Sequence, residues 1–106
     1  MNISFFLNAL QNKLNERKQA IGLTYFDHYD VFATEGKKFF KVYRQEIHAN
    51  SHKGPQHIVA FIDKVTGDIF KPASFNAPAK HSRGNVNSES HGMEAINEQG
   101  FVNYLR

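Results

Sequence analysis

The 106-residue chain contains no cysteine and no tryptophan, and only three of its residues are proline. The absence of cysteine excludes a disulfide scaffold and any zinc site that uses thiolate ligands. No stretch approaches the roughly 20 apolar residues that a transmembrane helix needs. The N-terminal segment lacks the basic start of a secretion signal, so we expect a cytoplasmic protein.

Aromatic residues are plentiful, with ten phenylalanines and four tyrosines. They supply enough bulk for a core without tryptophan. The length predicts a single domain over residues 1–106.

Apolar residues near the N-terminus recur at intervals of three and four, which predicts an amphipathic helix that covers a sheet. The stripe consists of Ile3, Phe6, Leu7, Leu10 and Leu14. Gly22 is placed to end this helix.

Alternating residues in the middle of the chain predict an antiparallel meander with strands at 25–34, 38–49, 57–63 and 69–71. Gly67 stands late in the loop before the last strand, where a type I turn with a G1 bulge needs a positive φ. The segment after Lys71 contains Pro72 and Pro78 and is expected to be a long loop.

Near the C-terminus, Ser88 or Ser90 is placed to cap a short helix that carries Met93 and Ile96. Residues 101–105 are expected to form a last strand or a docking tail. The predicted fold is therefore α+β, an antiparallel meander of three to four strands covered by an N-terminal helix, with a short C-terminal helix.

Positive charge is concentrated in the middle of the chain, although the net charge is only +3. Residues 36–57 carry five lysines or arginines against one acid, Glu46. Residues 69–88 carry three lysines or arginines and no acid. This distribution favours an anionic partner.

Two segments combine basic and aromatic side chains as proteins that bind single-stranded nucleic acid do. The predicted interface consists of Lys41, Arg44, Lys71, Phe75, Lys80, His81 and Arg83. Each segment also has a structural interpretation. In the segment after Lys71, Phe75 would fill the core. In the second strand, the lysines would protect a sheet edge from aggregation.

Neither metal binding nor catalysis is expected, and no cofactor. His48, His52 and His57 lie around a loop and lack the helical spacing of a zinc motif. His81, Ser82 and Arg83 are adjacent, and adjacent side chains rarely converge on one reacting atom.

The run VAFIDKVTGDIFKPASFNAPAK (residues 59–80), followed by Arg83-Gly84-Asn85, resembles a segment of small uncharacterised tailed-bacteriophage proteins. The resemblance covers about a quarter of the chain, residues 59–85 only. It implies a viral product that acts in the host bacterial cytoplasm, and it implies no activity or catalytic residue.

The leading hypothesis is a non-enzymatic protein that binds nucleic acid, either DNA or RNA, through a basic and aromatic surface. The alternative is an inhibitor or modulator that binds a host protein. A small hydrolase or nuclease is a third and weaker hypothesis, because no paired carboxylate or oxyanion arrangement is present.

Overall fold

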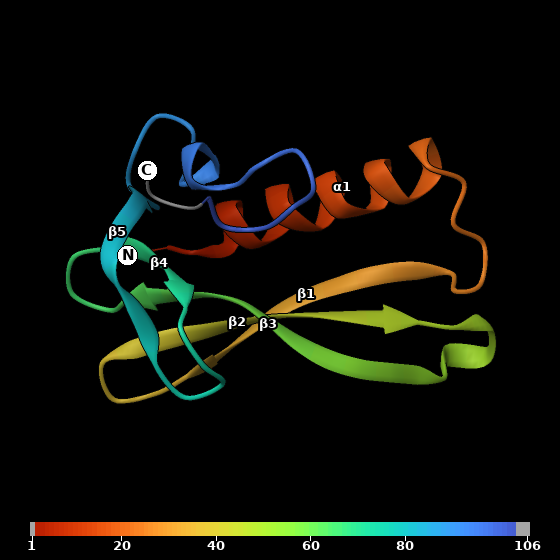
Figure 1. Cartoon of the computed structure of the whole chain (residues 1–106), viewed down its shortest axis with the longest axis horizontal. Helices are drawn as coiled ribbons and strands as arrows, with labels where there is room; N and C mark the ends of the chain where they lie inside the picture. The colour runs from red at the N-terminus through yellow and green to blue at the C-terminus, as the bar shows by residue number, and fades with distance from the viewer. Residues whose placement is uncertain (1, 104–106) are drawn as a thin grey trace.

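The N-terminal stripe forms helix α1 (Ser4–Ala20), which packs on one face of an antiparallel sheet (Figure 1). The computed structural model describes residues 2–103. The strands are β1 (His28–Glu35), β2 (Phe39–Ile47), β3 (Lys53–Asp63), β4 (Asp68–Pro72) and β5 (Pro78–Asn85). Short 3-10 turns, η1 (Ala49–Ser51) and η2 (Met93–Ala95), lie between β2 and β3 and after β5. The α+β class and the meander are thereby confirmed.

The sheet has five strands in the order β1-β2-β3-β4-β5, so the predicted number of three to four is wrong. The additional strand is β5, in the segment that was expected to be a loop. Pro78 is tolerated because it is the first residue of its strand. A turn closed by hydrogen bonds from the Ala73 and Ser74 amides to the Ala77 carbonyl returns β5 onto β4.

The expected C-terminal helix is only the three-residue turn η2. Gly92 precedes it at φ +95°, and a Cβ there would lie 2.6 Å from the Ile69 side chain. This left-handed backbone at Gly92 cannot continue a right-handed helix, so η2 begins only at Met93. Ile96 is already extended and bridges Val102. Of the predicted final strand, residues 104 and 105 lie outside the described residues.

The core lies between α1 and the sheet. Phe6 and Leu10 are fully buried, and Leu14 is nearly so, which confirms the predicted stripe. Ile62 and Ile69 are fully buried on the same face of the sheet. We call it the covered face, because α1 and the C-terminal segment both lie on it (Figure 1).

The glycine of the β3–β4 turn has the predicted positive φ. Gly67 has φ +80°, and its amide donates a hydrogen bond of 2.9 Å to the Asp63 carbonyl. Within residues 2–103 there is no helix with the length and apolar character to cross a membrane.

Candidate nucleic-acid interface

The face of the sheet opposite α1 carries aromatic side chains. Along β2, Val42 points into the core, so Lys41 and Tyr43 point to the opposite side by the two-residue period of a strand. Phe32 of β1 stacks on Tyr43 with ring centroids 5.2 Å apart. We call this side the open face.

Three phenylalanines from successive strands extend the aromatic surface of the open face. The Phe39 ring meets the rings of Phe61 and Phe70 edge-on, with centroids 5.9 Å apart in each pair. Edge-on contacts of this kind are the favourable geometry for aromatic pairs. The open face thus carries aromatic rings from four strands of the sheet.

The turn between β4 and β5 folds back onto the open face. Its Phe75 ring lies 6.5 Å from the Tyr43 ring and remains 60% exposed. The Lys41 Nζ lies 4.3 Å from the Phe75 ring centroid and 5.8 Å from that of Phe61. It also donates a hydrogen bond of 3.4 Å to the Asn76 Oδ1. Lys41 is therefore held between two aromatic rings.

A hollow of about 280 Å³ lies beside this contact. Its floor includes Phe39 and Tyr43, and Lys37 and Lys38 are exposed at its rim. Glu35 is the one acid among the described residues that line it, and its carboxylate is paired with the Lys64 Nζ at 2.5 Å. The hollow therefore combines aromatic surface with positive charge.

The structure brings together only part of the predicted interface. Lys41 and Phe75 meet on the open face, whereas Arg44 and Lys71 lie on the covered face. The Arg44 guanidinium stacks on Phe101, 4.6 Å from the ring centroid. The Lys71 Nζ donates to the Val102 carbonyl at 3.3 Å. The prediction of one surface containing all of the basic residues is wrong, because Lys41 and Arg44 are an odd number of positions apart on one strand.

The remaining three predicted residues lie on β5, at the edge of the sheet. Lys80 and His81 are exposed, and the Arg83 guanidinium donates to the His81 carbonyl. β2 pairs with both β1 and β3, so the interpretation of its lysines as edge protection is also wrong.

Sequence reasoning missed the aromatic platform that surrounds Lys41 and Phe75. Phe32, Phe61 and Phe70 belong to it, and each contacts another ring of the open face. Phe61 is next to the core residue Ile62 on β3, so the two-residue period of the strand could have assigned it to the open face. The contact between Lys41 and Phe75 could not be predicted from alternation, because it depends on the path of the β4–β5 turn.

The histidines considered for metal binding are only partly grouped. The rings of His48 and His52 are 6.3 Å apart, and His57 lies opposite Arg44 in the β2–β3 ladder. Within residues 2–103, no group of three or more His, Cys, Asp or Glu residues is arranged to hold a metal ion.

A family model matches residues 3–105, nearly the whole chain. The chain belongs to the DUF7717 family, which is described as a family of unknown function. The DUF7717 match includes α1 and every strand of the sheet. Neither the curated proteins nor the solved structures contain a match.

Proposed function

We propose that this protein binds single-stranded nucleic acid through its open face and catalyses no reaction. The observation that carries the proposal is the contact between Lys41 and Phe75. These residues are far apart in the sequence, yet the lysine Nζ lies 4.3 Å from a phenylalanine ring that is 60% exposed. An exposed ring beside a cation matches the two parts of a nucleotide, a base that stacks and a phosphate that is neutralised.

The surroundings of this contact support the same role. Lys37 and Lys38 extend the positive charge along the rim, and the Glu35 carboxylate is already paired. Stacking of one base on an aromatic side chain contributes about 1–3 kcal/mol. Each phosphate contact adds about 0.7 to the slope of log affinity against log salt for a single strand. The resemblance to phage proteins supports a role in the bacterial cytoplasm.

Fluorescence anisotropy with labelled single-stranded DNA, single-stranded RNA and duplex DNA, at two salt concentrations, tests the proposal. Phe75→Ala should weaken single-strand binding about tenfold and duplex binding less, because paired bases cannot stack on the ring. Lys41→Gln should lower the salt slope by about 0.7. Phe5→Ala is the matched control, since Phe5 is 57% exposed but lies on α1.

Two results would overturn the proposal. One is the absence of binding to any oligonucleotide at low salt. The other is an equal loss of affinity in Phe75→Ala and Phe5→Ala, which would remove the open face as the binding surface. The thermal unfolding of each variant shows whether a loss of affinity reflects a loss of folded protein. If no oligonucleotide binds, the host-protein modulator replaces nucleic-acid binding as the hypothesis.

A further inference from the structure

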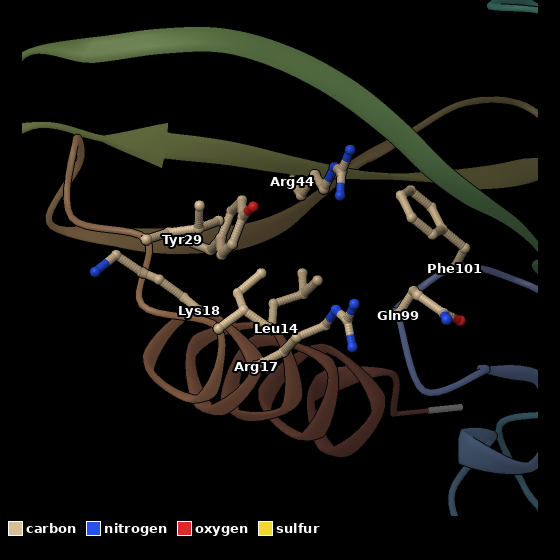
Figure 2. Close-up of a pocket in the computed structure, with 9 residues that line it drawn as sticks. Leu14, Arg17, Lys18, Tyr29, Arg44, Gln99 and Phe101 are labelled. Atoms are coloured by element: carbon tan, nitrogen blue, oxygen red, sulfur yellow. The ribbon is translucent and has the colours of Figure 1, made fainter.

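A second cavity, of about 190 Å³, lies on the covered face, between the C-terminal half of α1, β2 and the loop that precedes Val102 (Figure 2). Its lining residues are Leu14, Arg17, Lys18, Ile21, Leu23, Tyr29, Arg44, Gln99 and Phe101. In Figure 2 the guanidinium groups of Arg17 and Arg44 extend toward the side where Gln99 and Phe101 lie, whereas Lys18 extends away from them. We call this cavity the arginine pocket.

Local hydrogen bonds build the loop that closes the arginine pocket. The Asn97 Oδ1 accepts from the Gln99 amide at 2.9 Å and from the Phe101 amide at 3.1 Å. The Asn97 amide donates to the Phe101 carbonyl at 2.8 Å. Gly100 has φ +83°, and a Cβ there would overlap the Leu14 Cδ2. The loop backbone is therefore pressed against α1, which fixes the position of the Phe101 ring.

Arg44 is held between aromatic rings, and no carboxylate of residues 2–103 forms an ion pair with it. Its guanidinium lies 4.6 Å from the Phe101 ring centroid and 5.9 Å from that of Tyr29. The Arg44 Nε is buried and has no hydrogen-bond partner among residues 2–103. A buried donor without an acceptor destabilises the folded state. An anion within the pocket would supply an acceptor for the guanidinium.

Among the described residues, no aspartate or glutamate lines the arginine pocket. Glu16 and Glu98 line a separate shallow hollow together with Arg17. In the described part of the chain neither of them forms an ion pair with Arg17 or Arg44. Within residues 2–103, the lining of the pocket therefore combines two arginines and two aromatic rings with no carboxylate side chain.

We propose that the arginine pocket binds a terminal phosphate group, that is, a phosphomonoester. Guanidinium groups match phosphate oxygens with paired, charge-assisted hydrogen bonds. Two guanidinium groups also balance the charge of about −2 that such a group carries. The volume is below the roughly 300 Å³ at which pockets for whole drug-sized ligands begin, so the pocket admits the phosphate and a small attached group. The source of the phosphate is a free phosphomonoester or the phosphorylated end of a nucleic-acid strand.

Calorimetric titration with phenyl phosphate tests the proposal, with benzoate as the carboxylate comparison. Arg17→Gln removes one guanidinium, and Arg44→Lys keeps the charge but removes the planar fork. Each should weaken binding of phenyl phosphate about tenfold or more, since hydrogen bonds to charged groups are strong. Lys13→Gln is the matched control, because it removes one charge from the same helix outside the pocket. It should change the affinity less than about twofold.

Oligonucleotides with a 5′-phosphate or a 5′-hydroxyl distinguish the two sources. A preference for the phosphorylated end that disappears in Arg17→Gln identifies the strand end as the ligand. Binding of phenyl phosphate without such a preference identifies a free phosphomonoester.

Three results would overturn the proposal: no saturable binding of phenyl phosphate, an equal loss in Lys13→Gln, or benzoate binding as tight as that of phenyl phosphate. Phe75 lies on the opposite face of the sheet from the arginine pocket. The effect of Phe75→Ala on oligonucleotide binding therefore tests the open face separately from the arginine pocket.

Discussion

Glu94 ties the chain after β5 to η2. Its carboxylate accepts hydrogen bonds from the Ser88 hydroxyl at 2.6 Å, from the Ser90 hydroxyl, and from the Asn85 amide at 2.9 Å. Burial raises the pKa of this carboxyl, but these hydrogen bonds outweigh burial and lower the pKa from 4.5 to about 2. The charged form is thus favoured in the folded protein.

This lowered pKa predicts a pH dependence of stability. The stabilisation from Glu94 is fully present above a pH of about 4.5 and is lost as the pH falls toward 2. Glu94→Gln should lower the free energy of unfolding at neutral pH by about 1 kcal/mol, a small value because the side chain is exposed. It should also flatten the loss of stability between these pH values. Urea unfolding at pH values above and below this interval measures both effects.

Glu89→Gln is the control for this prediction, because Glu89 is exposed in the same segment. If Glu94→Gln and Glu89→Gln have the same pH dependence as the unchanged protein, the hydrogen bonds to Glu94 contribute nothing to stability.

At the scale of elements, the sequence predicted those parts of the fold that have a clear period. The stripe through Leu10 predicted α1, and the alternation around Val42 predicted β2. β5 was not predicted, because its segment has no alternating pattern and its strand pairs with β4 alone. The expected C-terminal helix is reduced to the turn η2. Gly92, which precedes η2, packs against Phe6 and Ile69, and no local sequence pattern predicts these contacts.

Substitution on α1 tests whether its packing stabilises the fold. Leu10 is fully buried, so Leu10→Ala should lower the free energy of unfolding by roughly 2–5 kcal/mol. Phe5→Ala on the same helix should lower the free energy of unfolding less, because Phe5 is 57% exposed. The Phe5 ring stacks on that of His91. Chemical unfolding of both variants measures the difference. A nearly unchanged stability of Leu10→Ala would show that the stripe does not pack in the core.

The candidate site was predicted less completely than the fold. Composition identified Lys41 and Phe75 as candidates, but their contact depends on a turn that crosses the sheet. The arginine pocket was not predicted, because it needs Arg17 from α1, Arg44 from β2 and Phe101 from a loop to converge. Such convergence follows from tertiary packing and not from spacing along the chain.

At the scale of the whole molecule, α1 and the sheet share one hydrophobic cluster. A domain of this size with one core is expected to unfold in a single cooperative transition. Circular dichroism reports on α1 and the strands, and the fluorescence of the four tyrosines, among them the buried Tyr43, reports on side-chain packing. We expect both signals to change at the same denaturant concentration. Loss of the helical signal before the tyrosine signal would show that α1 unfolds independently of the sheet.

Because each strand pairs with the next one in the chain, the order in which the molecule assembles can be inferred. Neighbouring strands are joined by short connections, so pairing them loses little loop-closure entropy and proceeds fast. By contrast, docking of Gly92 on Phe6 and of Gly100 on Leu14 joins the two ends of the chain. This closure is expected to come last. The open face would therefore exist as soon as the meander has formed, whereas the arginine pocket would be completed only when Phe101 reaches Arg44.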